Sequence, residues 1–235
     1  MSIGTVFNHI YSTNRWLFGS GTGALAFNNQ SYIRFLQRFL DSHPDINTVL
    51  DLGCGDWQIG SQIDWGERHY IGIDASDFII AKTQARYASA TIRFRVLNAV
   101  DEELPDADLI IIKDVLEHLS NENIDIILKK TEKYSYVLIQ NDIGVLTTLN
   151  ENIRDGGYRK LDVSAKPFAY RCELAKTYVE LHLQLLLSFL FGVSAASGLV
   201  SHSFIVFLML VLYTVVMTIE FMPIKAIHTR YNEKQ

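Results

Sequence analysis

The stretch VLDLGCGDW, residues 49–57, decides the fold of this 235-residue chain. Apolar residues that run into a Gly-Cys-Gly turn are typical of a buried strand followed by a ligand-binding loop, because glycines let the backbone approach a ligand closely. Asp51 and Asp56 place one carboxylate on each side of the glycines. These charges would repel a diphosphate in a partly dry site, so they favour a ligand that carries positive charge.

Helical and strand patterns alternate around this turn. Apolar residues at helical spacing predict helices at residues 29–40, 76–87 and 121–133, with a short one at 57–63. Apolar runs predict strands at residues 47–52, 69–73, 92–97, 107–112 and 136–140, and residues 158–163 could add one more. Strands that alternate with helices predict an α/β fold, in which a mostly parallel sheet is covered by helices on both faces.

The end of the second predicted strand carries another acid. Asp74 lies 19 residues after Gly55, where nucleotide-binding sheets place the carboxylate that accepts hydrogen bonds from both ribose hydroxyls. An NAD-binding turn needs a further glycine three positions after Gly55, and Gln58 stands there. No Gly-Lys-Ser or Gly-Lys-Thr follows the turn, which argues against an ATPase phosphate loop.

The sequences VLDLGCG and YIGIDAS together resemble the class I S-adenosylmethionine-dependent methyltransferases. The resemblance implies a Rossmann-like sheet whose glycine turn cradles the methionine part of S-adenosylmethionine, while the acid after strand two holds the ribose. The cofactor-binding residues that it implies are Asp51, Gly53, Cys54, Gly55, Asp74, Ala75, Asn98, Ala99 and Lys113. Asn98 stands where the family usually has an acid for the adenine amino group. An amide oxygen still accepts from that group but without charge assistance, and Asp101 is a second candidate.

A narrower, bacterial-type branch of this family is similar over roughly residues 15–168. The shared motifs are Gly19-Ser-Gly-Thr-Gly23, Asp56-Trp57, Lys113-Asp-Val-Leu-Glu-His118, Gln140-Asn-Asp142, Gly156-Gly-Tyr-Arg159 and Leu161-Asp162. The branch implies no particular methyl acceptor.

The candidate catalytic residues follow the fourth strand. His118 could act as a general base, because a neutral imidazole suits that role near pH 7, or it could only pack on the adenosine. Asp114 is the alternative, as a polar contact to the cofactor or the acceptor. Asn141-Asp142 could line the acceptor pocket or cap a helix, and residues 19–23 could form a lid or a plain linker.

Charge and composition exclude other classes. The formal net charge is −5 without a basic block, so no nucleic acid is expected as a partner. The seven histidines and two cysteines show no metal-ligand spacing, so no metal site is predicted. A Gly-x-Ser-x-Gly elbow for serine hydrolysis is missing from the sequence.

Residues 181–219 contain no Asp, Glu, Lys or Arg. One helix of this length would run about 58 Å, roughly twice the thickness of a hydrocarbon core. Two membrane spans joined near Gly198 and residues 201–203 therefore fit better. A single span over about 204–219 is an alternative, and so is a buried hairpin that joins copies of the chain into a homo-oligomer.

Positive residues flank this uncharged run on both sides. Lys176 precedes it, whereas Lys225, Arg230 and Lys234 follow it. Because positive flanks stay in the cytoplasm, we expect a membrane protein whose catalytic domain and both hairpin ends are cytoplasmic.

These patterns divide the chain into three parts. Residues 1–45 form a loop and helix covering the cofactor site, 46–170 the methyltransferase domain, and 171–235 a C-terminal hydrophobic helical hairpin with a polar tail. Since the hairpin takes the place of the usual last two strands, we expect a shortened sheet. The predicted function is methyl transfer to an unidentified acceptor at a membrane surface. The alternatives are a non-catalytic cofactor-binding or scaffolding protein and, less favoured, an NAD-dependent oxidoreductase.

Overall fold

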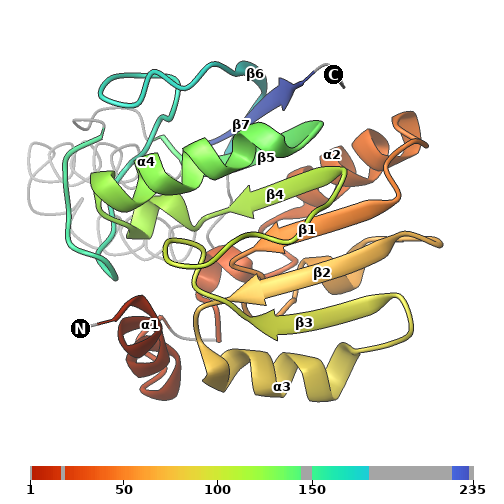
Figure 1. Ribbon diagram of the computed structural model, residues 1–235, viewed down its shortest axis with the longest axis horizontal. Helices are drawn as coiled ribbons and strands as arrows, with labels where there is room; N and C mark the ends of the chain where they lie inside the picture. The colour runs from red at the N-terminus through yellow and green to blue at the C-terminus, as the bar shows by residue number, and fades with distance from the viewer. Residues whose placement is uncertain (1, 17–18, 144–149, 180–223, 233–235) are drawn as a thin grey trace, which may run out of the picture.

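The computed structural model describes residues 2–16, 19–143, 150–179 and 224–232. They form a seven-stranded sheet with the order β3-β2-β1-β4-β5-β7-β6 (Figure 1). The strands that run parallel are β1 (Thr48–Leu52), β2 (His69–Asp74), β3 (Ile92–Val96), β4 (Leu109–Lys113) and β5 (Tyr136–Asp142). β7 (Ile224–Tyr231) pairs antiparallel with β5, and β6 (Glu173–Val179) pairs antiparallel with β7. The expected α/β, Rossmann-like sheet is confirmed.

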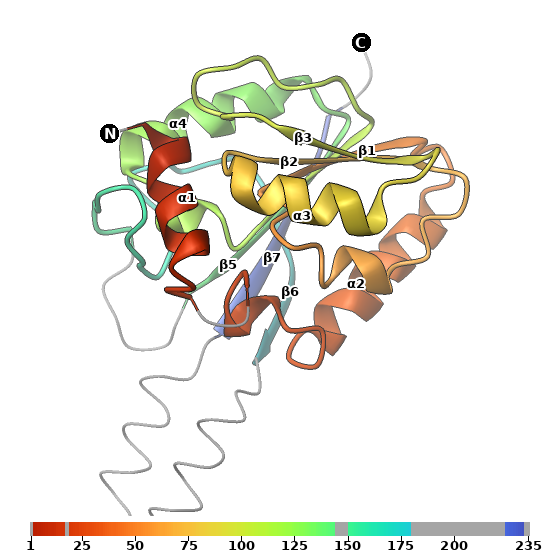
Figure 2. The ribbon, with the colours of Figure 1, turned by 90° about the horizontal axis from the view of Figure 1, so that it is seen from below.

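Helices cover both faces of the sheet. The helices are α1 (Ile3–Ser12), α2 (Gln30–Ser42), α3 (Asp77–Tyr87) and α4 (Asn121–Lys130), and the short 3₁₀ turns are η1 (Thr22–Ala24), η2 (Gly60–Gln62), η3 (Leu116–His118) and η4 (Thr131–Lys133). Figure 2 shows α4 on one face and α2 and α3 on the other. α1 was not expected from the sequence, and it packs against α3.

Local sequence explains where these helices begin and which face they bury. The Ser76 hydroxyl accepts a hydrogen bond from the Ile79 backbone N–H and so caps α3. α2 buries one stripe of side chains, which includes Tyr32, Leu36 and Leu40, against the sheet. The apolar β4 is buried between neighbours on both sides.

The expectation of a shortened sheet is wrong. β6 and β7 complete the sheet, and the uncharged run lies between them in the sequence. Residues 173–179 and 224–231, which the sequence assigned to the C-terminal part, therefore lie in the sheet. Val179 pairs with Ile224, so the chain leaves β6 and enters β7 at neighbouring positions.

The predicted hairpin over 181–219 lies outside the described residues. Among the described residues, no helix has the length and apolar character that a membrane span requires.

Two smaller expectations differ from the structure. The helix predicted at 57–63 is reduced to η2, because Trp57 has a positive φ of 58°, which a helix cannot contain. Residues 158–163 form no strand; Leu161 donates one backbone hydrogen bond to the Asp142 carbonyl at the end of β5.

Candidate active site

A pocket of about 830 Å³ lies at the carboxyl ends of the parallel strands. Its volume falls in the range of small-molecule sites. The glycine turn after β1 lines one part of it, and a cluster of charged side chains at the ends of β4 and β5 lines the other. α1 and the segment after it add Tyr11, Trp16 and Ser20 to the lining.

The glycine turn leaves no room for side chains. Gly53 has a φ of +79°, and a Cβ atom there would lie 2.2 Å from a methyl carbon of Val115. The backbone N–H groups of Gly53 and Cys54 donate to the Ile73 carbonyl at 2.7 and 3.0 Å, which joins the turn to the end of β2. Glycine is therefore required at 53 by both backbone conformation and space.

Asp74 is held at the end of β2 by backbone donors. Its carboxylate accepts from the Ser76 N–H at 2.9 Å and the Gly55 N–H at 3.2 Å, and the Tyr11 hydroxyl lies 3.5 Å away. Burial raises the pKa of Asp74 to about 6. The carboxyl lines the pocket, where it can accept from ligand hydroxyls.

Two more carboxylates surround the glycine turn. Burial raises the pKa of Asp51 to about 6, although the Tyr70 hydroxyl donates to its carboxylate. The Asp56 carboxylate accepts from the Ser20 N–H at 3.2 Å, and the Ser20 hydroxyl accepts from the Asp56 N–H at 3.0 Å. Three acids in one partly buried site suit a ligand with ammonium and sulfonium groups and disfavour a diphosphate.

The structure brings nearly all predicted cofactor residues to the pocket. Those that line it are Asp51, Gly53, Cys54, Asp74, Ala75, Asn98, Ala99 and Lys113. Gly55 does not line it; its N–H points to Asp74 instead. The Asn98 amide donates to Asp101 at 2.5 Å and accepts from the Val100 N–H at 3.1 Å, so its oxygen has one lone pair left for an adenine.

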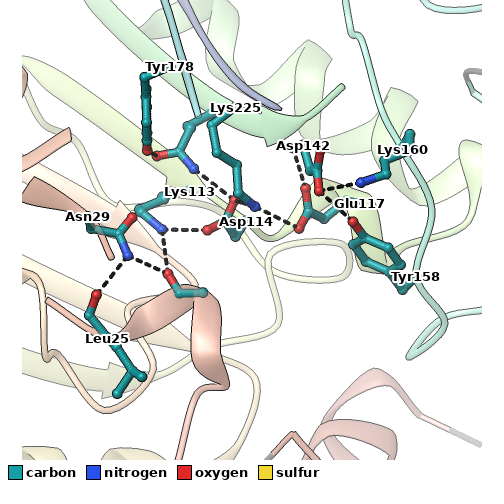
Figure 3. A network of polar contacts seen from close by, with 12 residues as sticks. Leu25, Asn29, Lys113, Asp114, Glu117, Asp142, Tyr158, Lys160, Tyr178 and Lys225 are labelled. Carbon is teal, nitrogen blue, oxygen red and sulfur yellow. Dashed lines mark hydrogen bonds and ion pairs between the residues drawn. The ribbon is translucent and has the colours of Figure 1, made fainter. Parts of the chain in front are cut away.

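Asp114 lies between two lysines (Figure 3). Lys113 is paired with one of its oxygens, while Lys225 of β7 at 2.9 Å and the Gln140 amide at 2.8 Å contact the other. Burial alone would raise the pKa of Asp114, but the two ammonium groups outweigh it and hold the pKa below its usual range. An acid so strongly ionised is a poor proton acceptor, which leaves Asp114 as a polar contact.

Glu117 and Asp142 extend this network (Figure 3). Glu117 accepts from the Asp142 N–H at 2.7 Å and lies 3.7 Å from the Lys225 ammonium. Asp142 accepts from the Tyr158 hydroxyl and from Lys160, each at 2.6 Å. Burial raises the pKa of Glu117 to about 7, against the attraction of Lys225.

His118 closes the pocket beside this network. Its Nδ1 lies 2.7 Å from the Gly157 carbonyl, which can only accept, so Nδ1 carries the proton and Nε2 keeps a lone pair. The Trp16 ring packs against the imidazole at 4.8 Å with 35° between the planes. Burial lowers the pKa of His118, so the ring is neutral at pH 7.

Sequence reasoning missed several pocket residues. Glu117 and Tyr158 stood in motifs that had no role assigned, and Lys225 was assigned to a membrane flank. Of Asn141 and Asp142, which the sequence offered as pocket lining or as a helix cap, Asp142 lines the pocket and Asn141 does not. Residues 224–231 mix charged and apolar residues without a regular alternation, so no local pattern indicated the strand that carries Lys225.

Comparisons with known proteins agree with this geometry. Residues 49–134 match the model of a family described as a methyltransferase domain. Magnesium protoporphyrin IX methyltransferase from Synechocystis PCC 6803 with bound S-adenosylmethionine aligns with a TM-score of 0.58 and 11% identity, over 98% of each chain. The [4+2]-cyclase SpnF aligns with a TM-score of 0.52 and 15% identity, over 84% of this chain and 82% of that one.

The methyltransferase domain of bacterial CtHen1-C aligns with a TM-score of 0.44 and 19% identity over 49% of this chain. The present chain spans 66% of that domain, just under two thirds. A search of curated proteins found no match.

The matched segment contains the acid-lined glycine turn and Asp74, and the described sheet has the same fold as the two solved structures that align with TM-scores above 0.5. Residues 49–134 are thus similar to a methyltransferase domain, and the two aligned Synechocystis structures contain bound SAM or SAH.

Proposed function

We propose that the protein methylates an oxygen or nitrogen atom of an acceptor presented at a membrane surface, with His118 as the general base. The methyl-transfer part of the proposal depends on one observation. The predicted cofactor residues around Asp74 and the His118 imidazole line the same pocket. The acceptor and the cofactor would therefore meet between these two groups.

The cofactor supplies the methyl group and carries its own leaving group. Asp74 lines the pocket and would accept hydrogen bonds from the ribose hydroxyls, and the methionine part would lie against the backbone of the glycine turn, where Gly53 also lines the pocket. Asp51 and Asp56 supply negative charge for its cationic groups. The protein's main contribution is to hold the two reactants in line and to exclude water.

His118 is placed to take the proton that the acceptor loses. The proton would move from an acceptor O–H or N–H to the Nε2 lone pair, while Nδ1–H stays bonded to the Gly157 carbonyl. The Trp16 ring, which packs against the imidazole at a tilt of 35°, would limit how the ring can turn.

The membrane part of the proposal rests on the sequence of the uncharged run and on where its ends attach. Residues 181–219 carry no formal charge, and the strand positions on either side of this run, Val179 and Ile224, are paired with each other. In the next pair, Tyr178 with Lys225, the lysine lines the pocket. Two membrane spans with both ends and the catalytic domain in the cytoplasm fit this attachment. The same run could also join copies of the chain into a homo-oligomer.

A labelling experiment tests the acceptor. The purified protein is incubated with a labelled methyl donor and a fractionated lysate, and the label is followed into lipid, protein, nucleic acid and small molecules. We expect label in the membrane fraction. Label confined to soluble small molecules would refute the membrane acceptor but not methyl transfer, whereas no label with intact cofactor binding would favour the scaffolding alternative.

His118→Asn tests the base. The asparagine amide can still donate to the Gly157 carbonyl, but it has no basic nitrogen. We expect the labelling rate to fall about 10²–10⁴-fold while calorimetric affinity for S-adenosylmethionine changes little. The native rate should rise with pH through a pKa below that of free histidine, and the variant should lack this inflection.

The control is His69→Asn, at the exposed start of β2. It should keep the native rate and pH profile. Equal loss in both variants, or an unchanged rate in His118→Asn, would remove His118 from the base role.

A further inference from the structure

Three cations lie close together where α2 meets β6. Arg34 and Arg38 are exposed on α2, one turn apart, and α2 has no carboxylate before Asp41. Lys176 of β6 donates to the Ser31 carbonyl at 3.2 Å, which joins the edge strand to the first turn of the helix. Burial lowers the pKa of Lys176, and the charges of the two arginines lower it further. The three positive charges therefore act on one another across this surface.

An exposed aromatic side chain, Phe27, lies in the turn just before α2. Phe27 is 69% exposed, the highest value among the large hydrophobic side chains of the described residues. The turn that carries it is anchored from inside, because the buried Asn29 amide donates to the Gly23 and Leu25 carbonyls at 2.6 and 3.0 Å. Phe27 is thus presented to solvent by an ordered turn.

This surface lies beside the point where the uncharged run attaches. Lys176 is three residues before Val179, whose partner Ile224 begins β7. In Figure 2 the connection between α1 and α2 lies at the same end of the molecule as the end of β6 and the start of β7. That end also carries the pocket residues Asp142 and Lys225.

We propose that Phe27, Arg34, Arg38 and Lys176 form a surface that docks on anionic lipid head groups, with Phe27 inserted at the interface. The proposal rests on the membrane attachment of the proposed function. Basic side chains near an anionic leaflet each add a modest attraction, and an exposed aromatic ring is stable at the level of the head groups. Docking here would turn the pocket towards the bilayer, so the charge of the lipid would control access of a membrane-borne acceptor.

The first test measures the depth of Phe27. Phe27→Trp in the full chain is reconstituted into phosphatidylcholine vesicles with brominated acyl chains, with or without about 30% phosphatidylglycerol. Quenching is compared with the native chain, whose three tryptophans give the baseline. We expect extra quenching in the variant that increases with the anionic lipid.

The matched control is Tyr231→Trp. Tyr231 is also an exposed aromatic residue, 52% exposed, but it lies at the opposite end of β7 from Ile224. It should show no extra quenching in either vesicle. Equal quenching of both tryptophans would mean that the surface has no defined orientation on the bilayer.

The second test removes charge. Arg34→Gln and Arg38→Gln are added to Phe27→Trp. Each should lower the ratio of docked to undocked protein about fivefold. The control pair, Arg93→Gln and Arg95→Gln, makes the same charge change on exposed side chains of β3, at the other edge of the sheet. It should leave the quenching unchanged.

Vesicle flotation separates the two possible failures. A native chain that does not float with the vesicles would overturn the membrane part of the proposed function. A native chain that floats while Phe27→Trp stays unquenched, or is quenched equally without anionic lipid, would overturn only the docking surface.

Discussion

Asp74, the predicted ribose acceptor, is a buried carboxyl group that lines the pocket. Its oxygens already accept two backbone N–H bonds, so the group is oriented before any ligand binds. Burial nevertheless raises its pKa to about 6, because two hydrogen bonds do not replace the water that a free carboxylate would have. A cationic ligand next to Asp74 and Asp51 would stabilise the ionised form.

Asp74→Asn should weaken S-adenosylmethionine binding by about 30-fold or more, since the charged acceptor of two hydroxyl bonds is lost. Isothermal calorimetry measures this, and Asp77→Asn, an exposed acid in the first turn of α3, is the control that should bind normally. An Asp74→Asn protein that folds and binds with native affinity would place the ribose contact elsewhere.

The raised pKa values of Asp51 and Asp74 also predict how pH acts. Protons compete with the cationic cofactor, so its affinity should fall as the pH drops through about 6. Stability of the cofactor-free protein should change in the opposite direction, because these carboxyls bind protons more tightly when folded than when unfolded. Their contribution is largest below the unfolded pKa and is lost as the pH rises through about 6. Calorimetry between about pH 4 and 8 measures the change in cofactor affinity, and thermal unfolding over the same range measures the change in stability.

At the scale of elements, β7 links the sheet edge to the active site. Its second residue, Lys225, has a side chain that is 5% exposed and neutralises both Asp114 and Glu117. The strand therefore contributes charge to the pocket as well as backbone pairing.

Lys225→Met should lower the free energy of unfolding by about 3–5 kcal/mol, because it leaves two buried carboxyls with less compensation. The loss should be smaller below about pH 7, where Glu117 can take up a proton. Thermal unfolding in detergent measures this, with exposed Lys129→Met of α4 as the control. Adding Glu117→Gln should recover part of the loss, and no recovery would mean that the pair does not interact.

At the scale of the whole molecule, the uncharged run is an insertion between two paired strands. Val179 and Ile224 are neighbours in an antiparallel pair, which a short turn can connect. The run can therefore be removed without deleting Lys225 or any other described part of the sheet.

Replacing residues 180–223 with an Asn-Gly turn should leave the sheet and the affinity for S-adenosylmethionine intact while membrane sedimentation is lost. Circular dichroism, calorimetry and vesicle sedimentation measure the three properties. Loss of cofactor binding would show that the insertion is part of the folded domain. Continued sedimentation would place the membrane attachment elsewhere.

The sequence alone determined strands β1 to β5 and brought out the pocket-lining residues that are predicted to bind the cofactor. These features depend on local patterns: an apolar run, a glycine turn and a carboxylate at each strand end. Burial of such strands leaves few alternatives, so neighbouring residues suffice to predict them.

Only the tertiary structure decided the second half of the site. Lys225 reaches Asp114 across more than a hundred residues of sequence because β7 pairs with β5. β6 and β7 mix charged and apolar residues, and a long uncharged run lies between them in the sequence. From hydropathy alone, both strands were therefore interpreted as the flanks of a membrane hairpin. Long-range strand pairing and the burial of an ion-pair network are properties of the packed chain, and no short stretch of sequence contains them.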